Sequence, residues 1–215
     1  MRVRSQAATA SPAGHLRRLV DFAEPRPDDI CLDIGPRTSG LASAIRPRVR
    51  ELVSAPPGSL PSRAFSLVTA RLVLAGTHDQ VGLVHDMLRV CAGRLVLADL
   101  VRTRAGGGGR VQRLRDPAYI ATRTFPELLD LLAWAGGRTR RLDVFTIERP
   151  AGPWLAQARE PERIQRELIA ELEGGPATGA RPRLIGDELW FAQSWAFVAV
   201  EPVSRTRGAA APPRR

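Results

Sequence analysis

The sequence predicts an α/β fold in which a mostly parallel sheet is covered by helices on both faces. Short apolar segments typical of buried strands alternate with segments whose apolar residues recur at helical spacing. Parallel strands need crossover connections, which are usually helices, so this alternation favours helices on both faces. With 215 residues, 44% of them hydrophobic, the chain is long enough for one domain with a substantial core.

The first half of the chain supplies a helix, a strand-turn-helix unit and two further strands. Residues 12–24 place apolar residues on one helical face and end before prolines. Residues 29–35 (DICLDIG) are typical of a short buried strand entering a turn, and residues 41–45 (LASAI) of the helix after it. Residues 51–55 and 64–74 predict two more strands.

The alternation continues with a helix over residues 79–91 and a strand over 93–101. Residues 102–116 are rich in glycine and predict a mobile surface loop. Thr124, followed three residues later by Glu127, has the spacing of a capping box that begins a helix.

The last third predicts a strand, two helices and a final strand. Residues 139–148 alternate as a strand, and a short helix is expected near Trp154. Residues 164–172 carry apolar side chains at helical spacing, and the last strand lies within residues 189–202.

Most of the excess positive charge lies in two tails. All 32 basic residues are arginines, which with 22 acids give a net charge of +10. Six arginines lie in residues 1–11 and 204–215, so residues 12–203, the predicted domain, carry 26 − 22 = +4. The composition of the tails predicts disorder, and the modest charge of the domain argues against a nucleic-acid partner. The absence of lysine excludes Schiff-base and P-loop chemistry.

The two cysteines, Cys31 and Cys91, lie in apolar patterns and are predicted to be core thiols rather than a disulfide or a metal-ligand pair. No apolar run reaches membrane-spanning length, and the N-terminus lacks the apolar segment of a signal peptide. The sequence therefore predicts a cytoplasmic protein without a membrane anchor.

Five blocks occur in an order typical of one enzyme family. They are residues 19–45, 65–74 (FSLVTARLVL), 83–101 (LVHDMLRVCAGRLVLADLV), 112–119 (QRLRDPAY) and 125–137 (FPELLDLLAWAGG). In this order they resemble the class I S-adenosylmethionine-dependent methyltransferases, in particular the small-molecule branch related to the ubiquinone and menaquinone C-methyltransferases. The resemblance implies a Rossmann-like sheet with an antiparallel last strand, S-adenosylmethionine as cofactor and a small-molecule substrate. Ligands of open parallel sheets also collect at the carboxyl ends of the strands on physical grounds.

The loop after the first strand departs from the GxGxG pattern of this family. It reads GPRTS over residues 35–39, so only the first glycine remains. Arg37 either meets the cofactor carboxylate or fills the cofactor's space. The candidate cofactor-binding residues implied by the resemblance are Asp33, Gly35, Arg37, Thr38 and Gly40.

A second departure concerns the acid that family members carry after the second strand to hold the cofactor ribose. Pro56 stands there, and no carboxylate follows up to Arg63. The nine residues 56–64 span at most about 30 Å, which is too short for the helix and strand that the family places there. The sheet is therefore predicted to lack one edge β-α unit. The apolar surface left uncovered predicts a homodimer or a partner subunit.

The catalytic candidates are His78 and Tyr119. This branch often has a His pair where residues 75–76 are Ala-Gly, and a His where Tyr119 stands. Tyr119 either positions a substrate or makes a structural hydrogen bond. Asp99, at the rim where ligands collect, has either a turn-capping or a functional role.

For the remaining histidines and for two tryptophans, the sequence predicts structural roles. His15 is predicted to be a solvated or capping residue, and His85 to lie on a helix face as a solvated or packed one. Trp195 is expected in the core, and Trp154 in a pocket wall or an interface.

Two functions of the folded domain remain open, beside a third, generic interpretation in which the tails alone carry the function. One is methyl transfer from S-adenosylmethionine to a small molecule. The other is that of a non-methylating relative, either a pseudoenzyme partner subunit or a cofactor-free enzyme that reuses the pocket.

Overall fold

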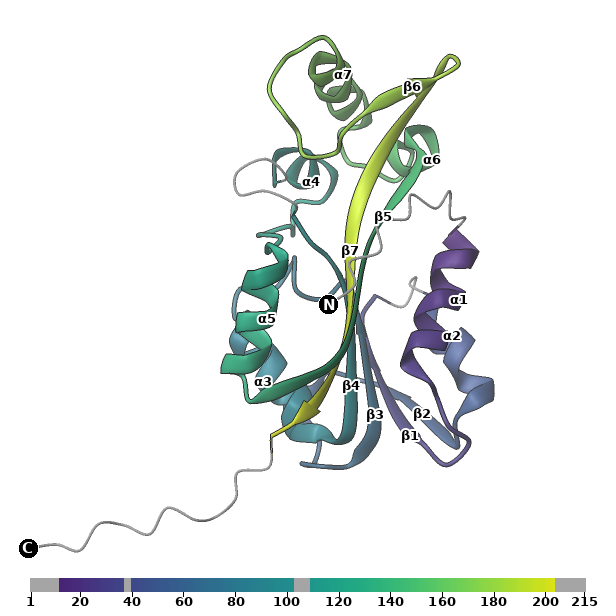
Figure 1. Cartoon of the computed structure of the whole chain (residues 1–215), viewed down its shortest axis with the longest axis vertical. Coiled ribbons are helices and arrows are strands. Elements are labelled where there is room, and N and C mark those ends of the chain that lie inside the picture. Colours follow the sequence, from purple (N-terminus) through teal and green to yellow (C-terminus); the bar gives the residue numbers. More distant parts are fainter. Residues whose placement is uncertain (1–11, 37–39, 103–108, 204–215) are drawn as a thin grey trace, which may run out of the picture.

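The computed structural model describes residues 12–36, 40–102 and 109–203, and it contains one mixed sheet with helices on both faces (Figure 1). The strand order is β2-β1-β3-β4-β7-β5, with β6 paired to β7 alone. The strands are β1 (Ile30–Ile34), β2 (Glu51–Ser54), β3 (Phe65–Arg71), β4 (Cys91–Leu100), β5 (Gly137–Pro150), β6 (Arg183–Ile185) and β7 (Glu188–Pro202). The strands β2, β1, β3 and β4 are parallel, and β7 is antiparallel to both β4 and β5. The predicted fold class, including the antiparallel last strand, is confirmed.

Helices cover the two faces in pairs, as Figure 1 shows. The helices are α1 (Pro12–Ala23), α2 (Leu41–Ile45), α3 (Gln80–Val90), α4 (Gly109–Arg115), α5 (Phe125–Trp134), α6 (Ala151–Leu155) and α7 (Pro161–Leu172), with short 3-10 turns η2 (Arg46–Arg48) and η3 (Pro57–Ser59). The helices α3 and α5 pack on one face and α1 and α2 on the other. The alternation along β1 explains both cores, because Cys31 faces one and Leu32 the other.

One edge of the sheet is β2, and neither a strand nor an α-helix lies between β2 and β3 in the chain. The chain leaves β2, passes through η3 and enters β3 on the far side of β1. This confirms the prediction that the sheet lacks an edge unit. The exposed large hydrophobic side chains of the described residues do not lie on β2, however; they are Val81, Trp134, Ile169, Leu172, Leu184, Ile185 and Val203. The expected uncovered apolar surface at this edge is therefore absent.

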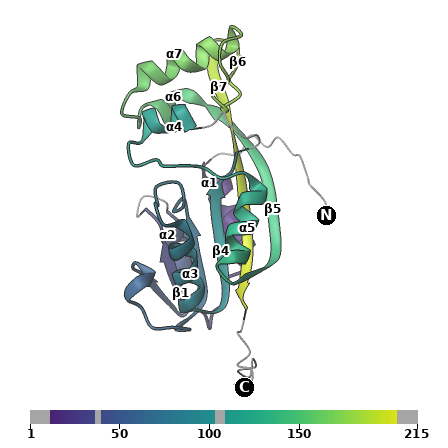
Figure 2. The same ribbon diagram turned by 90° about the vertical axis from the view of Figure 1, so that its left-hand side faces the viewer.

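Beyond the carboxyl ends of the parallel strands, β5 and β7 continue into a small cap formed by α4, α6, α7 and β6 (Figure 2). A separate hydrophobic cluster holds this cap together, with Leu114 of α4, Trp154 of α6, Ile164 of α7 and Phe191 of β7. The predicted loop over residues 102–116 is wrong for 109–115, which form α4. The reason is that Val111 and Leu114, three positions apart, are buried in the cap.

Other structural expectations have clear outcomes. The capping box at Thr124 and Glu127 is confirmed, and both cysteines are buried and free. No helix among the described residues is long and apolar enough to cross a membrane. The two predicted tails, residues 1–11 and 204–215, lie outside the described residues.

Candidate functional site

The candidate site lies at the carboxyl ends of β1, β3 and β4. The chain leaves β1 toward β2 on one side and returns to β3 on the other, so the strand order reverses at β1, where ligands bind in such sheets. Four residues mark this place: Asp33, Gly35, Arg71 and Asp99. We call them the carboxyl-end site.

Gly35 leaves β1 in a conformation that favours glycine. Its φ is 154°, and a Cβ there would lie 2.7 Å from the carbonyl oxygen of Arg71. Gly40 precedes α2 with φ 71°, in the left-handed region. At both candidate positions, the backbone conformation therefore favours glycine. The candidates Arg37 and Thr38 lie outside the described residues.

Asp33 is buried at the end of β1 and accepts a 2.8 Å hydrogen bond from Thr69 Oγ1. Burial raises the pKa of Asp33 above its ordinary value, although the Thr69 hydrogen bond and the charge of Arg71 act in the opposite direction. Because Thr69 occupies one carboxylate oxygen, Asp33 has a structural role in joining β1 to β3.

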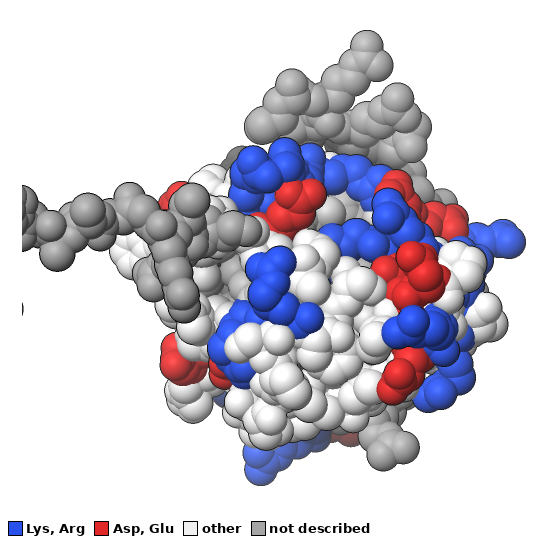
Figure 3. All heavy atoms as spheres, turned by 90° about the horizontal axis from the view of Figure 1, so that it is seen from below, with Lys and Arg blue, Asp and Glu red and all other residues white. Residues whose placement is uncertain are grey.

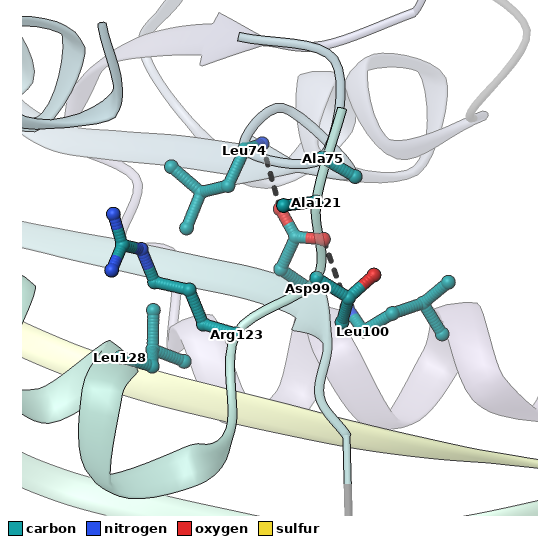
Figure 4. A pocket seen from close by; sticks show the side chains of 8 residues that line it. Leu74, Ala75, Asp99, Leu100, Ala121, Arg123 and Leu128 are labelled. Carbon is teal, nitrogen blue, oxygen red and sulfur yellow. Dashed lines mark hydrogen bonds between the residues drawn. The ribbon is translucent and has the colours of Figure 1, made fainter. Parts of the chain in front are cut away.

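Asp99 holds the turn after β3. Its Oδ2 accepts hydrogen bonds from the backbone N–H groups of Val73 (3.1 Å) and Leu74 (2.9 Å), and its Oδ1 from that of Leu100 (2.8 Å), as Figure 4 shows in part. Burial raises its pKa to about 6, against these three hydrogen bonds and the charge of Arg71. The sequence left a turn-capping and a functional role open for Asp99, and these hydrogen bonds support turn capping.

A small hollow beside Asp99 has a cavity volume of about 10 Å³ (Figure 4). It is lined by Leu74, Ala75, Asp99, Leu100, Ala121, Thr122, Arg123 and Leu128. Its volume is about the space of one water molecule, so the hollow does not accommodate a cofactor.

The two catalytic candidates lie on neighbouring loops. The Tyr119 hydroxyl donates to Thr122 Oγ1 and accepts from the Thr122 N–H, both at 2.9 Å, which fixes the loop. His78 is exposed. The two loops are joined by a hydrogen bond from the Ile120 N–H to the Ala75 carbonyl. No hydrogen bond joins His78 to Tyr119 in the described part of the chain, and a catalytic role for either stays a prediction.

His15 is buried, not solvated, so the expectation for it was wrong. Its ring lies 4.3 Å from that of Trp195 and 5.3 Å from that of Phe197, and neither ring nitrogen has a hydrogen-bond partner. Burial, followed by the charges of Arg71, Arg149 and Arg18, lowers its pKa to about 3. His85 is exposed, and Trp195 lies in the core as expected. Trp154 is buried within the cap rather than in a pocket wall.

No sequence motif indicated Arg71 of the carboxyl-end site, or Arg115 and Arg149, whose charges act near it. In a chain with 32 arginines, no single one stands out. The only weak signal is that Arg149 continues the alternation of Phe145 and Ile147 along β5.

The residues present do not match what S-adenosylmethionine needs. The residues after β2 are Ala55 and Pro56, and no carboxylate is available there for the ribose hydroxyls. The end of β3 carries the cation Arg71, on which the charges of Asp99 and Asp33 act, whereas the cofactor brings a positive sulfonium. No group of three or more metal-ligating side chains occurs in the described ranges either.

No protein-family model and no curated protein sequence matches the chain. Solved structures do. A candidate methyltransferase from Bacillus halodurans C-125 matches with a TM-score of 0.74 and 17% identity, over 88% of this chain and 99% of that one.

Two further structures differ in their described activity. The geranyl diphosphate C-methyltransferase of Streptomyces coelicolor A3(2), solved with Mg²⁺, geranyl diphosphate and S-adenosyl-L-homocysteine, has a TM-score of 0.57 at 13% identity, covering 89% of this chain and 78% of its own. The cyclase SpnF has a TM-score of 0.54 at 17% identity, covering 94% and 86%. This chain therefore has the fold of the S-adenosylmethionine-dependent methyltransferases.

Proposed function

We propose that this protein binds a small molecule at the carboxyl-end site and is a non-methylating relative within the methyltransferase fold. One observation carries the proposal: the chain passes from β2 through η3 directly into β3 without presenting a carboxylate for the cofactor ribose. The cation Arg71 at the end of β3 supports it, because it disfavours a sulfonium nearby. The match to the cyclase SpnF supports it further, since one fold hosts several chemistries.

The second candidate is S-adenosylmethionine-dependent methyl transfer to a small molecule. The matches to methyltransferases favour it, as does the position of Asp33, Gly35 and Gly40 around the turn after β1. Under this function His78 or Tyr119 would assist the reaction.

Calorimetric titration separates the two candidates. S-adenosylmethionine and S-adenosyl-L-homocysteine, each up to millimolar concentration, are expected to give neither heat nor a thermal shift. Micromolar binding of either would contradict the proposal and favour methyl transfer. Pro56→Asp returns a carboxylate to the end of β2, and weak binding that it alone creates would identify the missing acid as the cause. Gly152→Ala, far from β2, is the control for nonspecific changes.

A cytoplasmic location, a domain over residues 12–203 and a homodimer or partner subunit remain predictions. The face in Figure 3 has an uncharged centre, with arginines and acids intermixed along its rim. Such intermixing offers no continuous basic surface on this face, which supports the expectation that nucleic acid is not the partner. Light scattering at several concentrations tests the dimer, and a monomer at all of them would contradict it.

A further inference from the structure

Arg115 and Arg149 lie near Arg71 of the carboxyl-end site, and the three arginines come from separate elements. Arg71 ends β3, Arg115 ends α4, and Arg149 lies near the end of β5. Burial, followed by the charges of Arg115 and Arg71, lowers the pKa of Arg149 to about 10. Both charges that act on Arg149 are therefore positive. Burial also lowers the pKa of Arg115 and Arg71.

These guanidinium groups rest on aromatic rings. The Cζ atom of Arg115 lies 5.2 Å from the ring centroid of Trp154, and that of Arg149 lies 5.2 Å from Phe191. The centroids of the two rings are 4.5 Å apart, so the two arginines pack on one pair of adjacent aromatic rings. The Arg71 Cζ lies 5.5 Å from the Trp195 ring. Stacking holds the planar groups in place while it uses none of their N–H donors.

The donors of Arg115 and Arg149 are only partly used. Arg149 donates one hydrogen bond from Nη2 to Gln193 Oε1 at 2.6 Å. The Nε atoms of both residues are buried and have no hydrogen-bond partner. Neither residue forms an ion pair with an acid in the described ranges, although the charge of the exposed Asp116 acts on Arg115. Two partly buried cations with unpaired N–H donors lower the stability of the folded state unless an anion binds to them.

We propose that Arg115 and Arg149, with Arg71 beside them, bind the oxyanion group of a small molecule, either a phosphate or a carboxylate. Planar guanidinium groups bind both oxyanions through paired N–H donors. The buried His15, whose ring nitrogens have no partner, lies close enough for the charges of Arg71 and Arg149 to act on it. Two guanidinium groups on adjacent rings form a compact cluster, which fits a small ligand better than an extended polyanion. The inference rests on the proposed function in placing a small-molecule ligand here.

The test measures oxyanion binding without any methyl donor, so it fails or succeeds independently of the S-adenosylmethionine titration. Inorganic pyrophosphate and benzoate are titrated into the full chain by calorimetry, against NaCl of equal ionic strength. Arg149→Met and Arg115→Met keep the apolar stem on the rings but remove the charge. Arg163→Met is the matched control, because Arg163 is an exposed arginine of the cap that pairs with Glu160 at 3.0 Å.

At least one probe is expected to bind the wild type saturably, and each site variant should weaken that binding tenfold or more. The control should bind like the wild type. Without ligand, Arg149→Met should unfold at the same or a higher temperature, because it relieves repulsion among cations. The probe that binds identifies the oxyanion as a phosphate or a carboxylate. Absence of saturable binding for both probes overturns the proposal, as does an equal loss in Arg163→Met. A lower unfolding temperature for Arg149→Met together with unchanged probe binding also overturns it.

Discussion

Gly35 and the carbonyl oxygen of Arg71 approach so closely that no side chain fits between them. A Cβ at Gly35 would lie 2.7 Å from that oxygen, and Gly35 has a φ of 154°. This contact joins the turn after β1 to the end of β3, the two strands between which the strand order reverses. It therefore sets where the Arg71 side chain leaves the sheet.

Gly35→Ala is expected to destabilise the protein by about 2 kcal/mol, because the Cβ forces the two backbones apart and strains φ. Urea unfolding followed by circular dichroism measures the change. Gly152→Ala is the control, since Gly152 lies in α6 and an added Cβ there would have no atom within 4 Å, so the change should be neutral or slightly stabilising. Equal midpoints for Gly35→Ala and the wild type would contradict the contact.

Arg94→Met is expected to destabilise the protein by about 3 kcal/mol, because it leaves a buried carboxylate without its cation. Asp29 is buried and pairs with Arg94 at 2.6 Å, and Arg94 also donates to the carbonyl oxygens of Ala23 and Glu24 at the end of α1. Thermal and urea unfolding measure the loss.

The matched control for Arg94→Met is Arg48→Met. Arg48 pairs with Asp21 at 3.4 Å, and both side chains are exposed, so the loss should stay below about 0.5 kcal/mol. Similar losses in the two variants would show that burial of Asp29 does not matter.

Local spacing was enough to predict several features of the fold. The ten residues between β2 and β3 are too few for a helix and a strand, and the structure has only the turn η3 there. The capping box is equally local, because Thr124 and Glu127 bond across a single helical turn. These features depend on distances along the chain and not on what packs against them.

The features that were missed depend on tertiary contacts. The helix α4 follows a glycine-rich stretch and is stabilised by burial of Val111 and Leu114 in the cap. The pairing of β5 with β7 places Arg149 opposite Phe191, a register that no local pattern reveals. Likewise, His15 is buried only because rings of β7 lie beneath it.

Asp99→Ala is expected to destabilise the protein by about 2 kcal/mol at pH 4.5, because the backbone N–H groups of Val73, Leu74 and Leu100 lose their acceptor. Burial raises the pKa of Asp99 to about 6, so the folded state holds the proton more tightly than the unfolded state. This contribution to stability is present below the ordinary pKa of 3.8 and is lost as the pH rises through about 6.

The difference between wild type and Asp99→Ala should consequently be smaller at pH 7.5 than at pH 4.5, as urea unfolding at both pH values would measure. Asp116→Ala, which removes an exposed carboxylate, is the control measured at the same two pH values. A difference that grows with pH would refute the raised pKa.

His15→Phe is expected to stabilise the protein, and more so in acid. The imidazole lies among aromatic rings with no hydrogen-bond partner for either nitrogen. A phenyl ring of similar shape removes this unsatisfied polar group, which should stabilise the protein by about 1 kcal/mol at pH 7.5.

The folded pKa of His15 is about 3, against 6.5 in the unfolded chain, and burial is the main cause. As the pH falls below 6.5, His15 becomes protonated in the unfolded chain but stays neutral in the folded protein. The wild type therefore loses stability down to about pH 3. At pH 5 the advantage of the variant should therefore have grown by about 2 kcal/mol. Urea unfolding at pH 7.5 and 5 measures both values, with the exposed His85→Phe as the control. An advantage that is the same at both pH values would contradict a neutral, buried His15.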